Sequence, residues 1–491
     1  MRSIIDYNPR EPAHPDLVAR FHDLVALYES LRERRVLQTT AKHLVRQLSI
    51  NIPVYEHSRR GMLLLRIGMI AYDLLSLGKP LPHHRVLNRE EFLRSEPGVE
   101  ATGLRGGVQY FDAQVEYAER LVIENVIAAE RAGAKVCNYS PVTSIELQDR
   151  RVRRVFYTDR ATGVQHEARA RIVVNAAGPW VDKVLATARL PVARLLGGTK
   201  GSHIIVKPFA GAPKDAFYVE ARADGRPFFI IPWNAQYLIG TTEIRYDGDP
   251  GEARASEAEV RYLLAETNGV FPQAKLGVED IHYAYAGVRP LPRGSTGPES
   301  AITRKHIIMR HDDTNGLWTV IGGKLTTYRS LAEDAVDRIV KRAGLKARSC
   351  STREENLPGA DELEEAALEL QALQQWSEEG RKRLLTIYGG RARRILELAR
   401  DEPSLRASAD AEKAGLAAEV AFTIRREFAR NLVDILHRRT MAGLAPDLGA
   451  SVAPAVAAAA ADELGWSAAE TNQQLEDLKA YNSRLAPARA E

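Results

Sequence analysis

Two segments of the chain place small residues between an apolar run and a helical pattern. They are Val173–Asp182 (VVNAAGPWVD) and Thr319–Arg329 (TVIGGKLTTYR). Each predicts a strand, a tight turn and the N-terminus of a helix. Such a turn lets the backbone approach a ligand closely, and the helix end offers unpaired N–H groups to an anion. A pyrophosphate or the N1–C2=O edge of a flavin would suit either turn, and a plain βα turn is the alternative.

A second group consists of basic residues in apolar surroundings. Arg289 lies in AGVRPL, Arg304 lies in AITR, and Lys200 precedes the sequence GSH. A buried cation needs an anionic partner, which is either the phosphate or carboxylate of a substrate or an internal salt bridge. His203 begins an apolar run and is a candidate general base, with a purely structural role as the alternative.

Composition removes several classes of function. The net charge of +4 over 491 residues is too weak to indicate nucleic-acid binding. Cys137 and Cys350 are the only cysteines, so a zinc site built on thiolates is excluded and a reducing compartment is indicated. The pair His83-His84 is interpreted as surface loop, and no metal site is expected. The chain shows no nucleophile elbow and no Walker loop.

The elements that must position these residues follow from hydrophobic periodicity. The two turns are expected to belong to an α/β sheet, because each joins a strand to a helix. A set of strands between them is expected to form an inserted antiparallel sheet. Strands are predicted over Lys135–Cys137, Ala170–Gly178, Ser202–Val206, Phe228–Pro232, Tyr237–Thr241, Ile281–Val288 and Leu317–Ile321, and a hairpin over Pro141–Tyr157.

Helical periodicity predicts four helices around these strands. They cover Asp16–Leu37, Gln114–Gly133, Pro179–Leu185 and Lys324–Arg342. The stretch 81–107 contains several glycines and two prolines and is expected to be loop-rich, with one short helix. After a linker over 343–361, the composition turns to Ala, Glu, Leu and Arg, which predicts a separate helical domain.

No stretch of the sequence is apolar enough to predict a membrane-spanning helix, and Met1–Arg10 lacks the apolar core of a signal peptide. The expected location is therefore the cytoplasm. The amphipathic segment Met62–Leu77 favours ordinary core packing, and a membrane-facing surface is the alternative. In that alternative the protein is peripheral on the inner face of the cytoplasmic membrane.

The combination of motifs resembles the FAD-dependent glycerol-3-phosphate dehydrogenases of the quinone-linked, aerobic type, which belong to the DAO-like flavoproteins. The resemblance runs from about residue 24 to at least residue 440 and is specific only in combination. The strings that carry it are Tyr110-Phe-Asp112, Asn175–Asp182, Lys200–Ile204, Ile231-Pro-Trp233, Ile239–Thr242, Asp247–Pro250, Gly287–Leu291, Ala301–Arg304, Gly322–Arg329, Leu357-Pro-Gly359 and Glu419–Thr440.

The resemblance implies an oxidation of sn-glycerol 3-phosphate to dihydroxyacetone phosphate, with hydride passing to flavin N5 and electrons leaving to a quinone or to oxygen. It implies His203, Arg289 and Lys324 as catalytic residues. It implies that substrate is bound by Arg10, Ser202, Arg289 and Arg304. The residues implied to line the FAD are Ala176, Ala177, Gly178, Trp180, Gly322, Gly323, Lys324, Leu325 and Thr326. A homodimer is kept as a candidate assembly.

The implied fold is α/β: a DAO-type, Rossmann-like FAD-binding domain with an inserted antiparallel substrate domain, and a C-terminal all-α domain. The oxidoreductase part is expected over 1–345, the linker over 346–360 and the helical domain over 361–491. Within the first part, FAD-binding segments are expected at about 1–45, 111–185 and 284–345, and substrate segments at about 46–110 and 186–283.

One departure from the resemblance stands out. The chain has 35 glycines but no G-x-G spacing, so the G-x-G-x-x-G turn that holds the FAD pyrophosphate is not found. In place of the family motif HGGLRY the chain has Asp6–Arg10, where only Arg10 matches. Three explanations stay open: a start at an internal Met, a truncated inactive descendant, or a segment supplied by another chain. The alternative functions are accordingly a non-catalytic relative that binds a phosphate ester or a partner, and another DAO-type oxidase.

Overall fold

The computed structural model describes residues 15–75, 82–190, 193–293, 306–311, 314–373, 376–406, 408–410 and 415–487. Its largest sheet has nine strands in the order β12-β8-β11-β10-β9-β1-β3-β2, with β13 also pairing with β8. All of these pairs are antiparallel except β1 with β9. The strands are β1 (Val45–Tyr55), β2 (Arg85–Asn88), β3 (Leu104–Val115), β8 (Thr199–Val206), β9 (Ala216–Glu220), β10 (Pro227–Trp233), β11 (Gln236–Gly240), β12 (Ile244–Arg245) and β13 (Ile281–Arg289).

The two faces of this sheet have different surroundings, because successive side chains of a strand point to opposite sides. One face carries Ile204, Phe217, Phe228 and Ile230 into the main hydrophobic core. Helices α6 (Glu257–Val270) and α3 (Arg89–Ser95) cover that face and contribute Leu263 and Phe92. The opposite face carries the residues of the candidate site.

A second, three-stranded sheet has the order β14-β15-β7. Its strands are β14 (Ile307–Arg310), β15 (Leu317–Ile321) and β7 (Val173–Asn175), and β15 runs parallel to β7. Both parallel strands enter a short 3-10 turn and then a helix. The elements after β7 are η1 (Gly178–Trp180) and α5 (Val181–Ala186), and those after β15 are η5 (Leu325–Thr327) and α7 (Tyr328–Ala343).

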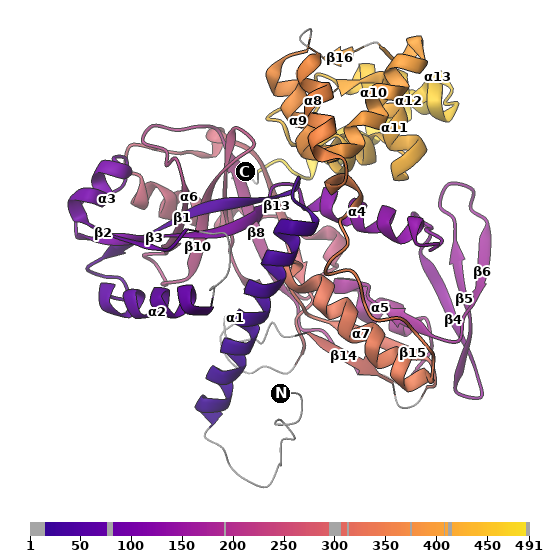
Figure 1. The fold of residues 1–491 in the computed structure, drawn as a ribbon, viewed down its shortest axis with the longest axis horizontal. Helices are drawn as coiled ribbons and strands as arrows, with labels where there is room; N and C mark the ends of the chain where they lie inside the picture. Colours follow the sequence, from indigo (N-terminus) through magenta and orange to yellow (C-terminus); the bar gives the residue numbers. More distant parts are fainter. Residues whose placement is uncertain are drawn as a thin grey trace.

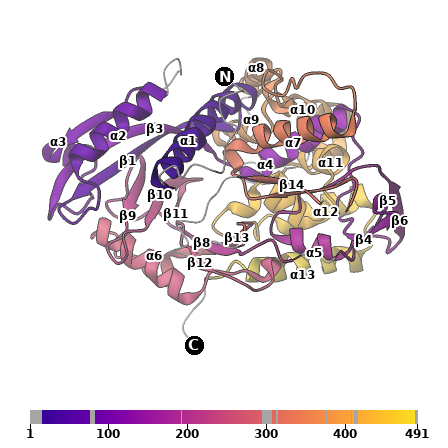
Figure 2. The same ribbon diagram turned by 90° about the horizontal axis from the view of Figure 1, so that it is seen from below.

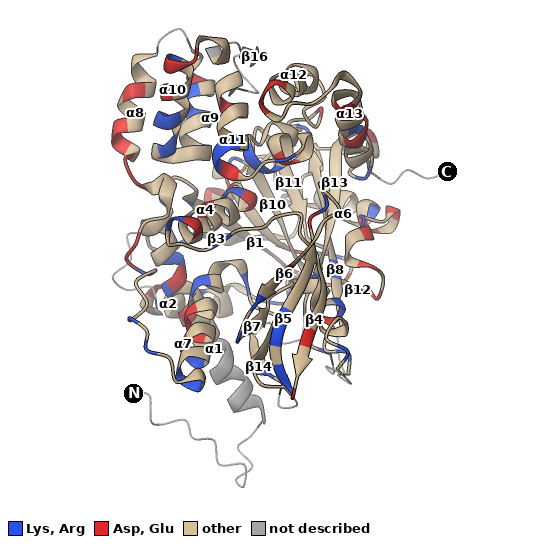
Figure 3. Cartoon of the chain, turned by 90° about the vertical axis from the view of Figure 1, so that its right-hand side faces the viewer, with Lys and Arg blue, Asp and Glu red and all other residues tan. Residues whose placement is uncertain are grey.

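A long helix, α1 (Pro15–Thr40), lies between the nine-stranded sheet and α7 (Figures 1 and 2). It is held to α7 by Arg329, whose Nε and Nη2 lie 2.6 and 2.9 Å from the two carboxylate oxygens of the fully buried Glu33. A three-stranded meander lies at the side of the molecule, where β5 presents a row of arginines (Figure 3). The remaining elements before the linker are α2 (Met62–Leu75), α4 (Ala118–Arg131), β4 (Val142–Gln148), β5 (Arg151–Thr158), β6 (Gln165–Arg169), η2 (Pro250–Glu252) and η3 (Val278–Asp280).

The C-terminal part is helical and lies at one end of the molecule, above α4 in Figure 1. It has its own core, in which Leu432, Ile435, Val456 and Ala457 are buried. Its elements are η6 (Pro358–Ala360), α8 (Leu363–Ala372), α9 (Glu378–Tyr388), η7 (Gly389–Arg391), α10 (Ala392–Asp401), η8 (Pro403–Arg406), β16 (Ser408–Asp410), β17 (Gly415–Leu416), α11 (Ala417–Glu427), the π-helical η9 (Asp434–Arg439), η10 (Ala442–Leu444), α12 (Ala453–Leu464) and α13 (Ala468–Ser483).

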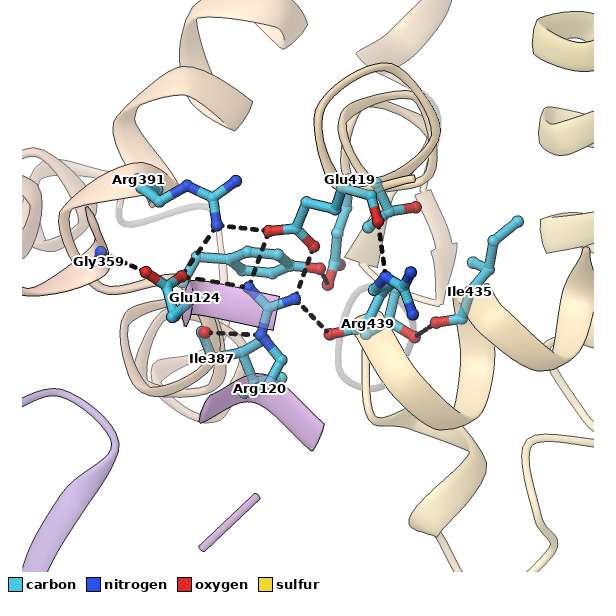
Figure 4. Close-up of polar contacts among 12 residues, drawn as sticks. Arg120, Glu124, Gly359, Ile387, Arg391, Glu419, Ile435 and Arg439 are labelled. Atoms are coloured by element: carbon cyan, nitrogen blue, oxygen red, sulfur yellow. Dashed lines mark hydrogen bonds and ion pairs between the residues drawn. The ribbon is translucent and has the colours of Figure 1, made fainter. Parts of the chain in front are cut away.

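A buried ionic network joins α4 to this helical part (Figure 4). Arg120 donates to both carboxylate oxygens of Glu427, at 2.6 and 2.8 Å. Arg391 bridges Glu427 and Glu124, at 2.6 and 2.9 Å, and the Gly359 N–H donates to Glu124. Although burial opposes ionisation, Arg120 and Arg391 lower the pKa of Glu427 to about 2. The linker, α4 and the C-terminal helices therefore share one set of compensated buried charges.

Most of the predicted elements are confirmed, and the exceptions have local causes. The stretch Lys135–Cys137 is irregular and pairs with no strand among the described residues. The predicted helix Gln114–Gly133 begins later, at Ala118, because Gln114 and Val115 still pair with β1. The stretch 81–107 contains the short helix α3 but also β2 and the start of β3.

The interpretation of Met62–Leu77 as a core segment is wrong for one side of the helix. Five large apolar side chains of α2 are 54–73% exposed. Its inner side is anchored by the buried Met69 and by Tyr72, whose hydroxyl donates to the Phe111 carbonyl at 3.3 Å. The exposed residues are Leu63, Leu64, Ile67, Ile70 and Leu74.

The ionic network predicts a large effect for loss of one member. Arg391→Met should lower the free energy of unfolding by about 3 kcal/mol, because Glu124 and Glu427 stay buried with less compensation. The exposed Arg394, which pairs with Glu397, is the matched control, and Arg394→Met should cost less than about 1 kcal/mol. Urea unfolding followed by far-UV circular dichroism measures both. Equal stability of the two variants would contradict the role assigned to the network.

Candidate functional site

The candidate site lies where β13 pairs with β8 on the open face of the large sheet. The register places Arg289 opposite Thr199, Gly287 opposite Gly201, and Tyr285 opposite His203. Paired residues of adjacent strands share a face, so these six residues stand in two parallel rows on one surface. A guanidinium and an imidazole therefore point to the same side of the sheet with two glycines between their positions.

The Arg289 guanidinium is held in place by groups around the end of β11. Nη2 donates to Thr241 Oγ1 at 3.2 Å, and Nη1 lies 3.7 Å from Glu243 Oε1. The guanidinium lies close over Gly201, since a Cβ atom there would be 2.5 Å from Nη2. Its side chain remains 26% exposed, although Nη1 is itself buried, so a cation is fixed at the sheet surface with part of the side chain open to one side. A guanidinium held in this way suits binding of a phosphate or carboxylate.

His203 is held between two neighbours on the same face. Its ring stacks on Tyr285, with ring centroids 5.0 Å apart and planes 18° apart, and it lies against Gly240. Its Nδ1 is buried without a hydrogen-bond partner among the described residues. Burial, and secondly the charge of Arg289, lower the pKa of His203 to about 4. The imidazole is therefore neutral at neutral pH, and a ring nitrogen is unprotonated there.

The Gly322-Gly323 turn reaches this face from the second sheet. Gly322 N–H donates to the Pro290 carbonyl at 3.0 Å, so the turn lies directly beside the end of β13. Both glycines have positive φ angles, 73° and 94°, which side-chain-bearing residues rarely adopt. Lys324 is exposed in the next position, next to Leu325. The hydrogen bond thus brings Lys324 to the same end of the sheet as Arg289.

The other predicted turn lies at the same edge of the small sheet, because β7 and β15 are parallel. Asn175 shapes it: its Oδ1 accepts from the Ala177 N–H at 3.2 Å, and its Nδ2 donates to the Val181 carbonyl at 3.0 Å. Gly178 has a φ of 56° and open space where a Cβ would lie. Trp180 is 42% exposed. The two turns predicted from the sequence therefore lie at one edge of the small sheet. Ala176 belongs to the turn that follows β7.

A cavity of 360 Å³ lies between the η5 turn and the open face of the large sheet. Leu325 and Thr326 line it from the turn, and Thr327, the N-cap of α7, gives no side-chain hydrogen bond to the helix end. An aromatic ring system with a polar edge fits between apolar strand residues and the positive end of that helix. The lining residues from the sheet and α1 include Arg34, Leu37, Leu48, Ile50, Tyr110, Asp112, Phe229 and Ile231. The residues present thus fit the flavin ring of FAD.

Ser202 and Lys200 do not join this face. The Ser202 hydroxyl donates to Glu259 Oε1 at 2.8 Å on the α6 side of the sheet, and Ser202 is fully buried. Lys200 forms the internal salt bridge that was the alternative for a buried cation, 2.8 Å from Glu259 Oε2. Arg10 and Arg304 lie outside the described residues. Of the expected substrate-binding residues, the structure thus places Arg289 in the site and turns Ser202 away from it.

Sequence reasoning passed over several residues of the site. Thr241 and Glu243 hold Arg289, Tyr285 holds His203, and Gly201 and Gly287 separate the two functional groups. Four of the five lie within or directly beside the quoted motif strings. Three of the five lie on β8 and β13, and the register that pairs these two strands is not visible in one sequence.

Comparisons with known proteins agree with this geometry. Residues 6–329 match the family model described as FAD dependent oxidoreductase, and residues 350–471 match the C-terminal domain of alpha-glycerophosphate oxidase. The glycerol-3-phosphate dehydrogenase of Synechocystis sp. is 42% identical over 92% of this chain and 85% of its own length. The chain belongs to the FAD-dependent glycerol-3-phosphate dehydrogenases.

Further members of this family support the assignment over the whole chain. Glycerol-3-phosphate dehydrogenase 2 of Mycobacterium tuberculosis is 31% identical and covers 92% of this chain and 77% of its own length. The crystal structure of glycerol-3-phosphate dehydrogenase from Bacillus halodurans complexed with FAD matches with a TM-score of 0.76 and 26% identity. That match covers 95% of this chain and 87% of the other. The mixed α/β fold with a C-terminal helical domain is thereby confirmed.

The position of Ser202 generates a prediction for this glycerol-3-phosphate dehydrogenase relative. Ser202→Ala should lower the free energy of unfolding by about 1 kcal/mol, because Glu259 loses one hydrogen-bond donor in a buried setting. The same variant should bind inorganic phosphate as the unchanged chain does, because its hydroxyl faces away from Arg289. Chemical denaturation and isothermal titration calorimetry measure the two effects. Weaker phosphate binding with unchanged stability would restore Ser202 to the substrate site.

Proposed function

We propose that this chain oxidises sn-glycerol 3-phosphate to dihydroxyacetone phosphate with FAD as the oxidant. The observation that carries the proposal is the placement of Arg289 and His203 on one face of the large sheet, beside the Gly322–Thr326 turn. The substrate is inferred from the names of the relatives, and the residues of the site have the chemical groups that such a substrate needs. The substrate offers a phosphate to a guanidinium and a secondary hydroxyl to a neutral imidazole.

Each residue has a distinct task in this proposal. Arg289 binds the phosphate, and its contacts with Thr241 and Glu243 keep the guanidinium flat against the sheet. His203, which is neutral at neutral pH, takes the proton of the C2 hydroxyl as the substrate is oxidised. FAD, when bound, supplies the two-electron oxidant that accepts the hydride from C2. Removal of one proton and one hydride leaves the C2 ketone, so atoms and electrons balance.

The flavin-binding residues that we propose come from the two turns. Gly178, Gly322 and Gly323 let the backbone approach the ring system, since their φ angles are positive. Lys324 would lie near the ring and the reacting oxygen. The complete proposed set is Ala176, Ala177, Gly178, Trp180, Gly322, Gly323, Lys324, Leu325 and Thr326. Roles for Arg10 and Arg304 in substrate binding, and a homodimer, remain predictions.

We further propose a quinone as the electron acceptor and α2 as the element that contacts the membrane. The exposed stripe of Leu63, Ile67, Ile70 and Leu74 follows the spacing of one helix face, and Arg66 is exposed beside it. Apolar side chains with a flanking cation suit the boundary of an anionic bilayer. Among the described helices, none has the length and apolar character needed to cross a membrane.

An anaerobic titration tests the proposed reaction. The chain loaded with FAD should lose its visible flavin absorbance on addition of sn-glycerol 3-phosphate. Arg289→Met should raise the half-saturating concentration at least about tenfold, because a charge-assisted pair with the phosphate is lost. A higher melting temperature in the presence of glycerol 3-phosphate, without any flavin reduction, would favour the non-catalytic alternative. Reduction by an amino acid, but not by glycerol 3-phosphate, would favour another DAO-type oxidase.

Sedimentation with vesicles tests the membrane surface. The unchanged chain should bind vesicles that contain anionic phospholipid. A double variant with Leu63→Glu and Ile67→Glu should bind at least about tenfold less, because two charges replace apolar side chains that would enter the bilayer. Leu368→Glu on α8 is the matched control, since Leu368 is 68% exposed in the C-terminal part. Equal binding by the double variant and this control would contradict a role for α2.

A further inference from the structure

Two glycines stand directly opposite each other between the two functional groups of the site. Gly201 of β8 pairs with Gly287 of β13. This pair lies two residues along the strands from the pair Tyr285–His203, and Gly287 lies two residues from Arg289 in the other direction. Both glycines lie on the open face, where any side chain would project toward the ligand. Neither has a positive φ angle, so backbone geometry does not require glycine at either position.

Gly201 makes room for a protein side chain. A Cβ at this position would lie 2.5 Å from Arg289 Nη2 and 2.7 Å from Nη1, and 2.5 Å from Thr241 Oγ1. The guanidinium and the hydroxyl that holds it therefore occupy the space above Gly201, and Gly201 is buried beneath them. Gly201 allows Arg289 to fold back along the sheet toward His203.

Gly287 has open space above it in the part of the chain that the structure describes. It is exposed, and a Cβ at this position would meet no described atom within 4 Å. The open space above it adjoins Arg289 two residues along the strand and Tyr285 two residues in the other direction. Alternate residues of a strand are about 7 Å apart, so Gly201 and His203 of β8 stand about that far apart along the strand.

We infer that Gly287 is a specificity-determining residue. Because it has no side chain, the carbon chain of the substrate can lie directly over its backbone. The phosphate would be held by Arg289 above Gly201, and the proton acceptor His203 lies two residues along β8. The site therefore fits a short 2-hydroxy phosphate monoester. In such a substrate one oxygen and one methylene separate the phosphorus from the carbon that is oxidised. The inference rests on the proposed function and adds which residue limits the size of the substrate.

Calorimetric titration of four chains with two probes tests the inference. Gly287→Ala should weaken binding of sn-glycerol 3-phosphate about tenfold and leave binding of inorganic phosphate within about twofold, because only the ester extends over Gly287. Gly201→Ala should weaken both probes at least about tenfold, because the guanidinium must move. Gly61→Ala, at an exposed position with no atom within 4 Å, is the matched control and should bind both probes like the unchanged chain.

Thermal unfolding of the same chains separates binding from folding. Gly287→Ala should have the same melting temperature as the unchanged chain, because its added methyl group meets no atom of the described residues. Equal affinity of Gly287→Ala and the unchanged chain for sn-glycerol 3-phosphate would overturn the inference while leaving the proposed function in place. Equal weakening of both probes by Gly287→Ala would also overturn it. An unchanged chain that binds neither probe would contradict the proposed function itself, and the inference with it.

Discussion

The alternation of side chains along β8 is the constraint on which the candidate site depends. Successive residues of a strand must point to opposite faces, so His203 and Gly201 face the cavity side while Ser202 and Lys200 face α6. The pairing of β8 with β13 then sets Arg289 on the same side as His203. A shift of one residue in this register would bury the imidazole against α6 and expose Ser202, so the packing of Ile204 and Ile230 in the core also fixes the chemistry.

The second sheet and the C-terminal helices hold their own parts in place by other means. The hydrogen bond from Gly322 to Pro290 ties the Gly322-Gly323 turn to the end of β13, so the two sheets meet beside the candidate site. Farther away, Arg120, Arg391 and Glu427 make a buried ionic junction under the helical part. Such a junction allows few other positions of α4 relative to the helical part, because any shift of α4 would leave a buried charge without its partner. We infer that it fixes the orientation of the helical part more than it adds to net stability.

Much of the fold was predictable, because strong local patterns agree with the final structure. The β15 strand, its double-glycine turn and the following helix were readable, since β-branched residues, two glycines and helical periodicity succeed each other there. The direction of Ser202 was not readable, because it depends on which neighbours the strand acquires. The exposed stripe of α2 was not readable either: apolar spacing shows that a helix has an apolar face, but not whether another element covers it. The strand expected at Lys135–Cys137 fails for lack of a partner, which is a tertiary property.

A structure of the FAD-loaded chain with sn-glycerol 3-phosphate tests the central claim most directly. The account predicts the phosphate within hydrogen-bond distance of the Arg289 guanidinium, the carbon chain over Gly287 and the C2 hydroxyl facing the His203 ring. A phosphate bound elsewhere, with the open face of β8 and β13 empty of substrate, would contradict it.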